Sequence, residues 1–354
     1  MGLGLYIPKH QPKKTHKNTN PNKNSKTNKT TNKTVKVSEQ YLNILSTNAC
    51  DLKHKAEDLK NKVKYFNSSV FSIQETHYRK KGKFRMKNFH IFESIRKNKE
   101  NGGTLLGVQL GLEPVLIKEY NETFELLVVE VKVANKNIRL ITGYGPQENW
   151  GIDDRTPFYT ALEEEIAAAE LQGRSVIVTM DANAKLGPEY IAEDPYKQTP
   201  NGKLLAGVVS RHVLCVVNGL TEKRNGLITR QKCTVLGVQK SVIDFVIISS
   251  DLVKHIEEIH IDDERFNVLT KNLKTKTGNE YSESDHNVIN TKFKLSWSPD
   301  ECEVIEVFKY DDTKAKKMFQ KVTTDTNHLS SIINMKKPID IVTTKFLKRL
   351  KGFI

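Results

Sequence analysis

The sequence lacks the features of a membrane or secreted protein. No stretch approaches the ~20 apolar residues that cross a bilayer, and the opening segment Met1–Ile7 is too short for a signal peptide and has no basic leader. The few cysteines form no C-x-x-C pair and no Cys/His cluster: Cys50, Cys215, Cys233 and Cys302. This spacing argues against a zinc site and against a disulfide framework. We expect an intracellular protein with reduced thiols and no membrane partner.

Acidic residues are missing from the first 38 residues. Nine lysines there give a charge of +9, residues 300–354 add +3, and only +2 of the formal +14 remains for the middle. The Lys/Asn/Thr-rich composition of residues 9–36 cannot bury enough apolar surface to offset chain entropy, so residues 1–38 are predicted to be a disordered arm. Two interpretations stay open, a solvated low-complexity tail and a phosphate-binding or nuclear-import arm.

Residues 39–299 have the pattern of one α/β domain. One helix is predicted after Asp51 as its N-cap, and another over Phe158–Leu171, closed by Gly173. Short alternating or β-branched runs predict strands at 41–47, 70–74, 89–94, 104–110, 125–133, 137–143, 175–180, 213–217, 242–248 and 287–295. Many strands with few helices between them predict two packed sheets flanked by helices. Residues 300–354 are predicted to be a linker-like tail with short helices.

Polar residues stand at the ends of these predicted strands, where side chains can converge. In chain order they are Asn48, Gln74-Glu75-Thr76, Gly143-Tyr144-Gly145-Pro146, Asp181-Ala182-Asn183, Ile243-Asp244-Phe245 and Ser284-Asp285-His286. Each alone is weak, since a lone Glu75 is typical of a surface and a lone His286 of a structural histidine. Their joint occurrence in this order points to one catalytic site.

The ordered series resembles the signature motifs of the endonuclease/exonuclease/phosphatase superfamily, and it spans nearly all of Leu42 to Leu295. The resemblance implies a four-layer α/β sandwich with two packed mixed β-sheets flanked by helices. It also implies cleavage of phosphate esters with Mg²⁺ or Mn²⁺.

The residue types suit this chemistry. Phosphodiester hydrolysis needs a cation, a positioned water and donors for the nonbridging oxygens. Carboxylate and amide oxygens of Asn48, Glu75 and Asp285 are ligands that Mg²⁺ accepts.

The remaining motif residues are expected to act on the water and the phosphate. The resemblance implies that Asp181 orients or deprotonates the water and that Asn183 holds the phosphate. Asp244 would orient His286 through one ring nitrogen, leaving the other for the scissile phosphate. Tyr144 is implied to donate its phenol to the phosphate or the leaving group.

Within the superfamily, the sequence is most similar to the apurinic-like endonuclease domain of non-LTR (LINE-type) retrotransposon proteins. The similarity rests on Gln74-Glu75-Thr76, Thr179-Met180-Asp181-Ala182-Asn183, Ser284-Asp285-His286, and Thr229 upstream of Asp244. It implies nicking of target DNA, leaving a 3′-hydroxyl that primes reverse transcription. A nuclear location, a reverse transcriptase domain in the parent element and no organic cofactor are the further expectations.

Three features depart from the pattern. Tyr144 has Gly143 and Gly145 as neighbours, where the family commonly has Asn or Tyr-Ala surroundings. Cys50 stands where some relatives have a carboxylate, which places more of the metal binding on Glu75. Arg230 follows Thr229 where the family often has an aromatic residue. Thr229 is therefore interpreted either as a DNA contact or as an ordinary loop threonine, whereas Ser284 is expected to bind substrate.

Two other functions remain open from the sequence. One is a repair-type apurinic nuclease of the same fold, and the other is an inactive, transposon-derived remnant that binds nucleic acid. Inositol phosphatases are disfavoured because the Asp244 segment lacks their Trp-Cys-Asp-Arg motif.

Overall fold

The computed structural model describes residues 40–96, 102–275 and 278–297. These residues fall within the predicted 39–299 domain, while the predicted arm at 1–38 and tail at 300–354 lie outside them. Within the described part of the chain, no helix is long and apolar enough to span a membrane.

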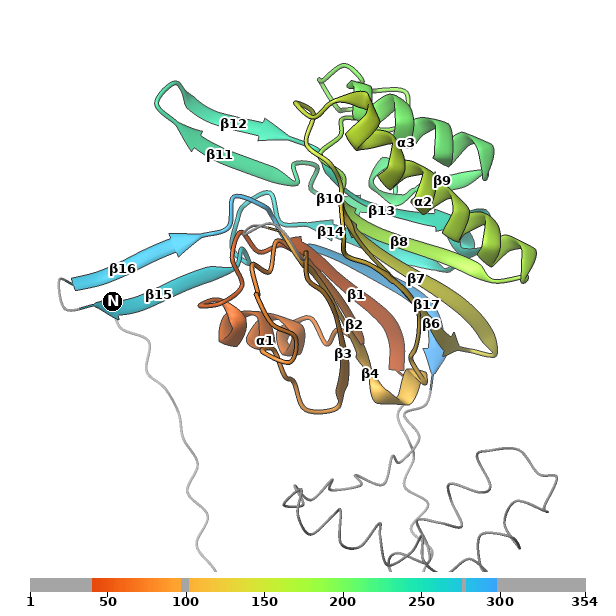
Figure 1. Cartoon of the computed structure of the whole chain (residues 1–354), viewed down its shortest axis with the longest axis horizontal. Coiled ribbons are helices and arrows are strands. Elements are labelled where there is room, and N and C mark those ends of the chain that lie inside the picture. The colour runs from red at the N-terminus through yellow and green to blue at the C-terminus, as the bar shows by residue number, and fades with distance from the viewer. Residues whose placement is uncertain (1–39, 97–101, 276–277, 298–354) are drawn as a thin grey trace, which may run out of the picture.

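Two large mixed β-sheets form the centre of the molecule (Figure 1). The first sheet has seven strands, in the order β10 (Arg224–Asn225), β14 (Ile256–Ile261), β17 (Ile289–Trp297), β1 (Gln40–Asn48), β2 (Val70–Gln74), β4 (Thr104–Gln109) and β3 (Phe89–Ser94). The second has six, in the order β5 (Val115–Tyr120), β6 (Glu125–Val133), β7 (Lys136–Tyr144), β8 (Ser175–Asp181), β13 (Asp244–Ser249) and β9 (Leu214–Val216). The pairs β1–β2, β7–β8 and β10–β14 are parallel and the other pairs in these sheets are antiparallel.

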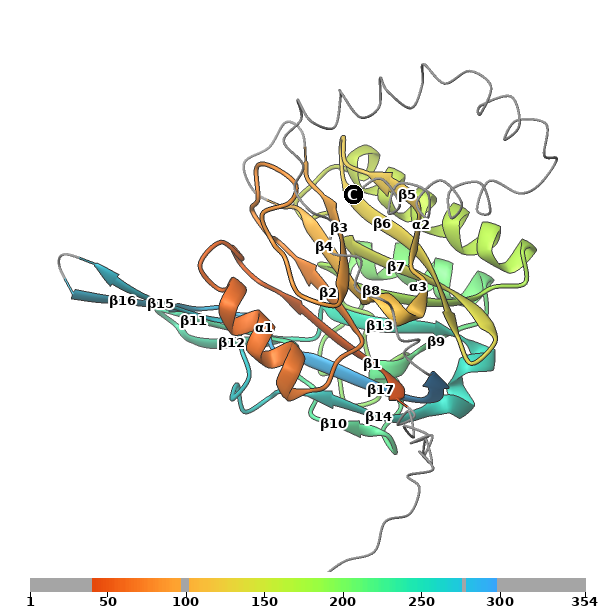
Figure 2. The same cartoon turned by 90° about the horizontal axis from the view of Figure 1, so that it is seen from below.

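Three helices cover the outer faces of the sheets. Helix α1 (Ala56–Tyr65) lies on the first sheet, and α2 (Ile152–Leu171) and α3 (Pro200–Arg211) lie on the second (Figures 1 and 2). The short 3₁₀ helices are η1 (Leu110–Leu112), η2 (Val217–Gly219) and η3 (Ser250–His255). The order helix, sheet, sheet, helices is the four-layer α/β sandwich expected from the sequence.

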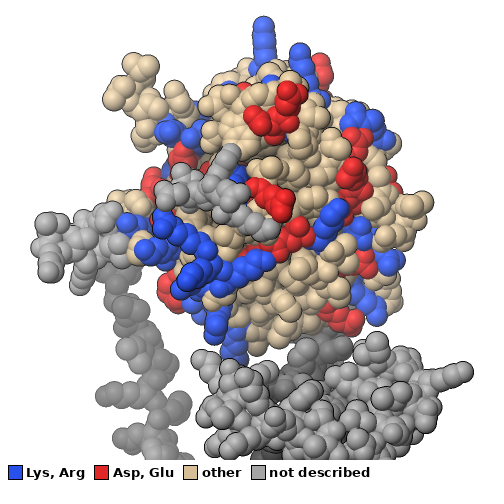
Figure 3. Space-filling model, viewed as in Figure 1, with Lys and Arg blue, Asp and Glu red and all other residues tan. Residues whose placement is uncertain are grey.

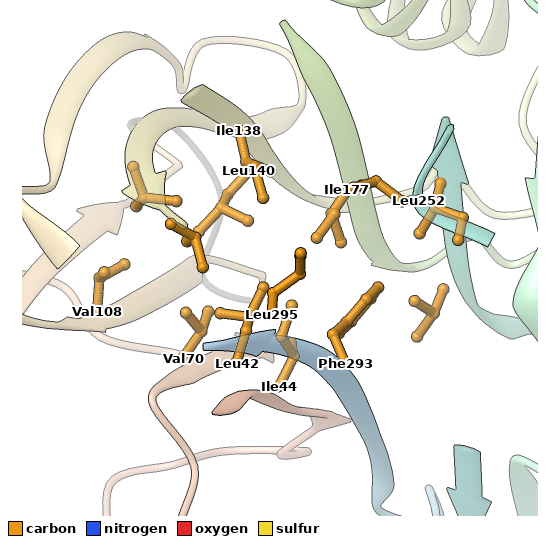
Figure 4. Packing of buried hydrophobic residues seen from close by; sticks show 14 of the residues in the cluster. Leu42, Ile44, Val70, Val108, Ile138, Leu140, Ile177, Leu252, Phe293 and Leu295 are labelled. Carbon is orange, nitrogen blue, oxygen red and sulfur yellow. The ribbon is translucent and has the colours of Figure 1, made fainter. Parts of the chain in front are cut away.

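Each interface between layers has its own apolar cluster. One joins α1 to the first sheet, one joins α2 and α3 to the second sheet, and the largest lies between the two sheets. Figure 4 shows this central cluster, with Leu42 and Ile44 of β1 facing Leu140 of β7 and Ile177 of β8. Burial on both faces explains why the central strands β8 and β13 of the second sheet are apolar at most positions.

Strand β6 illustrates this pattern. Its side chains alternate between the faces, so that Leu127 and Val129 enter the central cluster while Leu126 and Val128 pack towards α2 and α3. A one-residue slip would exchange the two sets.

Several sequence expectations are corrected. Helix α1 begins at Ala56 after Lys55, and Asp51 is not its N-cap but adopts a left-handed conformation (φ 77°) and accepts the N–H of Lys53. Helix α2 begins at Ile152, six residues earlier than predicted, because it continues through Pro157 and carries acidic residues in its first turn, where the helix dipole favours them. The elements not predicted were α3, β5, β10, β14 and a hairpin at Thr270–Glu283, whereas a hairpin loop was expected at 220–240, where the structure has most of a second hairpin.

The two hairpins are β11 (Arg230–Thr234) with β12 (Gly237–Ser241), and β15 (Thr270–Thr275) with β16 (Gly278–Glu283). Both project from the same side of the sandwich in both views (Figures 1 and 2). The first begins at Arg230 and the second ends just before Ser284. Both therefore start or end beside predicted site residues.

Gly107 tests the packing against the first sheet. It pairs with Phe71 across β2 and β4, and a Cβ at this position would lie 2.0 Å from the Phe71 ring. We expect Gly107→Ala to lower the free energy of unfolding by roughly 1–3 kcal/mol, measured by urea denaturation, because the buried ring has to move. Combining it with Phe71→Leu should cost less than the sum of the single changes.

The matched control is Gly151→Ala, whose added Cβ meets nothing closer than 3.7 Å. We expect it to cost less than about 1 kcal/mol, since alanine is only a poorer N-cap than glycine. Equal effects at Gly107 and Gly151 would contradict the packing argument.

Candidate active site

The second sheet places three of the predicted residues side by side. Asp181 ends β8, pairs with Tyr144 at the end of the parallel strand β7, and pairs with Asp244 at the start of the antiparallel strand β13. The first sheet contributes Asn48 at the end of β1, Glu75 after β2, and His286 three residues before β17. The strand ends of both sheets therefore meet at one place.

Hydrogen bonds connect the sheets at this end. The Asn48 amide donates to Asp181 Oδ2 at 2.8 Å, and His286 Nδ1 lies 2.9 and 3.0 Å from the two carboxylate oxygens of Asp244. The other ring nitrogen, Nε2, lies 3.8 Å from Asp181 Oδ2. Asp181, Asp244 and His286 are each at most 3% exposed, so this cluster is shielded from bulk water.

This burial changes the acid–base properties of the cluster. Burial and the neighbouring Asp244 charge raise the pKa of Asp181 to about 7, although His286 and Asn48 oppose the shift. Burial lowers the pKa of His286, but Asp244 and Asp181 outweigh it and bring that pKa to about 9. Near neutral pH the cluster thus pairs a carboxylate that is more basic than usual with an imidazolium.

Glu75 and Asp285 lie at the more exposed side of the cluster, with side chains 21% and 25% exposed. Burial alone would raise the pKa of Glu75. Hydrogen bonds from His77, Tyr144 and Asn48 outweigh this effect and bring the pKa below its usual value, to about 2. Burial also raises the pKa of Asp285, but His286, Cys50 and Arg230 lower it below its usual value. Both carboxylates are therefore ionised at neutral pH.

The donor set suits a divalent cation. In the described residues, two groups of three side chains bring metal-binding atoms within 4.8 Å of one another: Asp181, Asp244 and His286, and Cys50, Asp285 and His286. Glu75 belongs to neither group, so it would hold a cation together with bound waters, as Mg²⁺ sites with one or two carboxylates do. The side-chain amide oxygen of Asn48 (Oδ1), also a predicted ligand, accepts the backbone N–H of Cys50 at 2.9 Å.

Tyr144 and Asn183 line the same cluster from the second sheet. Burial and the charges of Glu75 and Asp181 raise the pKa of the Tyr144 phenol, which keeps it a proton donor. Asn183 donates its backbone N–H to Asp181 Oδ1 at 2.9 Å and its amide to the Gly145 carbonyl at 3.0 Å. The structure therefore brings all five predicted catalytic residues together.

Thr229 and Ser284, the predicted substrate contacts, are fully buried. Thr229 Oγ1 accepts the backbone N–H groups of Ile243 and Asp244, at 2.9 and 3.0 Å. Ser284 Oγ donates to the backbone carbonyl of Asn48 at 2.7 Å and accepts the backbone N–H of His286. In this structure both hydroxyls hold site residues in place.

The sequence reasoning missed two cations at the site. The Arg230 guanidinium lies 2.9 Å (Nε) and 2.7 Å (Nη2) from Asp285 Oδ2. Lys55 is 2% exposed and donates to the carbonyls of Ala49 and Cys50. The Arg230 substitution for an aromatic was a usable signal, whereas nothing local marks Lys55.

A basic segment near the site was also missed. Six of the nine residues from Arg79 to Lys87 are Lys or Arg, with no acidic residue among them, and all six are exposed. The segment begins four residues after Glu75, in the connection from β2 to β3. In the view of Figure 3, Lys and Arg side chains gather on the side of the molecule from which the hairpins project. Net charge over the whole middle of the chain conceals this concentration.

The backbone is unusual around the site. Cys50, Asp51, Glu75, His77 and Asn183 all have positive φ values, between 43° and 77°. Such conformations are uncommon outside glycine and cluster at functional sites.

These layers and strand ends define a four-layer α/β sandwich with a cluster of polar side chains between the sheets at one end. The chain has the fold of the endonuclease/exonuclease/phosphatase nucleases, as comparison with solved structures shows. No protein-family model matches the sequence, and no curated protein sequence matches it.

Three of the similar structures are nucleases. The endonuclease domain of TRAS1, a telomere-specific non-LTR retrotransposon, is 18% identical with a TM-score of 0.51, over 72% of this chain and 99% of that domain. The AP endonuclease LMAP from Leishmania major is 13% identical with a TM-score of 0.55, over 72% and 88%. The APE2 catalytic domain of Xenopus laevis is 13% identical with a TM-score of 0.57, over 73% and 94%. At these identities the similarity establishes the fold.

Thr229→Val tests the anchoring contact. Valine keeps the shape but leaves the N–H groups of Ile243 and Asp244 without their acceptor, so the free energy of unfolding should fall by about 1–3 kcal/mol in urea denaturation. Thr229→Ser should stay close to the parent, because it keeps the hydroxyl. Unchanged stability in the valine variant, with weakened DNA binding, would instead favour a direct DNA contact.

Proposed function

We propose that this chain is a divalent-metal-dependent endonuclease that hydrolyses phosphodiester bonds in DNA. The observation that supports it most is the buried Asp181–His286–Asp244 cluster, held between two sheets beside the ionised Glu75 and Asp285. A buried base, an imidazolium and an outer pair of carboxylates are the groups that phosphodiester hydrolysis needs.

Asp181 is the proposed base for the attacking water. Its pKa of about 7 allows it to take a proton near neutral pH. The Asn48 amide fixes the carboxylate through Oδ2, and the Asn183 backbone fixes it through Oδ1. Asn183 and Tyr144 are the proposed neutral donors to the phosphate.

His286 is the proposed stabiliser of negative charge on the phosphate. Asp244 holds Nδ1, so Nε2 faces Asp181 and Asp285, where the phosphate is proposed to bind. With a pKa of about 9, the ring stays cationic through neutral pH.

Glu75 and Asp285, with Asn48, are the proposed holders of Mg²⁺ or Mn²⁺. A bound divalent cation would neutralise charge that develops on the phosphate and the leaving oxygen. Attack of water on phosphorus with breaking of the bond to the 3′ oxygen is proposed to leave a 3′-hydroxyl and a 5′-phosphate. In a LINE-type element a reverse transcriptase would extend that end, and the chain would act in the nucleus.

The nicking assay tests the function directly. Purified chain should relax supercoiled plasmid in Mg²⁺ and not in EDTA, and Asp181→Asn and His286→Gln should each slow nicking by roughly 10²–10⁴-fold. The matched control is Glu163→Gln, which removes the α2 carboxylate that pairs with Arg211 of α3 at the surface, away from the site. Similar rates for Asp181→Asn and Glu163→Gln would rule the assignment out.

A repair-type specificity is the second arm of the same assay. Two of the similar solved structures are an AP endonuclease and an APE2 catalytic domain. Strong preference for an abasic duplex over the intact duplex would favour that alternative over nicking of intact target DNA.

The basic segment Arg79–Lys87 is the proposed binding surface for the DNA backbone. Reversing Lys80 and Lys83 to Glu should weaken duplex binding and reduce the slope of log affinity against log salt by about 0.9 for each phosphate that the protein no longer neutralises. Fluorescence anisotropy at several salt concentrations measures both quantities.

The control for this change is Lys132→Glu with Lys254→Glu. Both lysines are exposed, and they lie near the opposite ends of β6 and β13 from the site. Equal loss of affinity in the two double variants would show that net charge, and not this segment, determines binding.

A further inference from the structure

Cys50 lies against two residues of the proposed active site. Its sulfur is 3.0 Å from Asp285 Oδ1, and His286 Nε2 is 3.7 Å from the same oxygen. The three ligand atoms all lie within 4.8 Å of one another. No Cys/His spacing in the sequence indicated this group, because Cys50 and His286 are far apart in the chain.

A thiolate, an imidazole and a carboxylate are the ligand types that zinc prefers. A tetrahedral zinc ion holds such atoms about 3.3–3.5 Å apart, so the observed separations need only small side-chain shifts. Mg²⁺, in contrast, takes oxygen ligands. The sulfur therefore gives this part of the site a preference for Zn²⁺ over Mg²⁺ that oxygen ligands alone would not have.

Each member of the group is already oriented by a partner. His286 Nδ1 is bonded to Asp244, which is the carboxylate–histidine arrangement common at zinc sites. Arg230 binds Asp285 Oδ2 and leaves Oδ1 towards the sulfur.

Cys50 is held at the backbone. Its N–H donates to Asn48 Oδ1, and its carbonyl accepts from Lys55 Nζ at 2.9 Å. The left-handed conformation of Cys50, with φ 43°, is fixed by these contacts.

We propose that Cys50, Asp285 and His286 form a Zn²⁺-binding site that overlaps the catalytic centre, so that Zn²⁺ inhibits the enzyme. On binding, the Cys50 thiol and the His286 imidazolium each release one proton to solvent, and no electron is transferred. His286 Nε2 becomes a zinc ligand and is no longer free to face a phosphate. The inhibition rests on the proposed nuclease function, whereas the binding does not.

Metal binding is measured first, on the full chain and without DNA. Competition with a chromophoric chelator gives the Zn²⁺ affinity, and Co²⁺ as a substitute reports sulfur ligation through its thiolate charge-transfer absorption. We expect Cys50→Ser to lose that absorption and to weaken Zn²⁺ binding by about tenfold or more. Unchanged affinity and absorption in Cys50→Ser would overturn the proposal.

The matched control is Cys233→Ser, which removes an exposed thiol on β11 outside the group. It should bind Zn²⁺ and Co²⁺ as the parent does. Cys50→Asp is the second variant, and it should also lose the cobalt–thiolate absorption while keeping a metal ligand. A thermal melt of this variant that matches the parent's would confirm that it is folded. Loss of the signal in Cys233→Ser and not in the Cys50 variants would place the zinc elsewhere.

Nicking in Mg²⁺ with added Zn²⁺ completes the test. The ratio of rates with and without micromolar Zn²⁺ should be far lower for the parent and Cys233→Ser than for Cys50→Ser. If Zn²⁺ does not lower the nicking rate of the parent, the proposed inhibition is wrong, whereas the nuclease proposal still holds. Zinc binding without nicking under any condition supports the metal site and counts against the nuclease.

Discussion

The approach of the two sheets at one end is the constraint on which the site depends. Between the sheet centres, apolar side chains such as Ile44 and Leu140 fill the space. Next to the site, this layer gives way to Ser72, Gln74 and Thr142, which hydrogen-bond across the gap. Only then do the Asn48–Asp181 and His286–Asp244 contacts follow. These polar side chains let the sheets come close while pairing most of their buried donors and acceptors, although Gln74 Oε1 has no hydrogen-bond partner among the described residues.

The same closeness concentrates negative charge. Asp181 and Asp244 are buried, and Glu75 and Asp285 stand beside them, so burying these carboxylates is costly unless cations compensate. His286 compensates the inner pair and Arg230 the outer Asp285, while Lys55 adds a buried positive charge nearby. The remaining negative charge lies on the more exposed side, where a divalent cation can enter from solvent.

The sequence predicted the site better than its surroundings. Asp181 and Tyr144 could be placed because an apolar strand ends at each of them, and parallel neighbours end at the same edge of a sheet. The starts of α1 and α2 were predicted wrongly because Asp is typical of helix N-caps and Pro of the first turn of a helix. At Asp51 and Pro157 tertiary packing overrides these local preferences. The hairpins carry no clear alternation, and their positions depend on pairing.

The sequence could not reveal the backbone contacts of Thr229 and Ser284 for a different reason. Thr229 and Ser284 act through backbone groups of residues distant in the sequence, Asp244 and Asn48. Such contacts leave no periodicity to find. The resemblance drew attention to both residues but implied a substrate contact, and it contained no information on burial.

Two of the departures from the family pattern act on one carboxylate. Cys50 replaces a carboxylate found in some relatives, and Arg230 replaces an aromatic residue; in the structure both bond to Asp285, one to each oxygen. Together they make the site less negative than the pattern implies, because one acid is absent and one base is present. A less negative site attracts a hard dication more weakly, and Arg230 supplies part of the missing charge in fixed form. Because Cys50 and Arg230 share this partner, substitutions at the two positions are expected to be coupled and not additive.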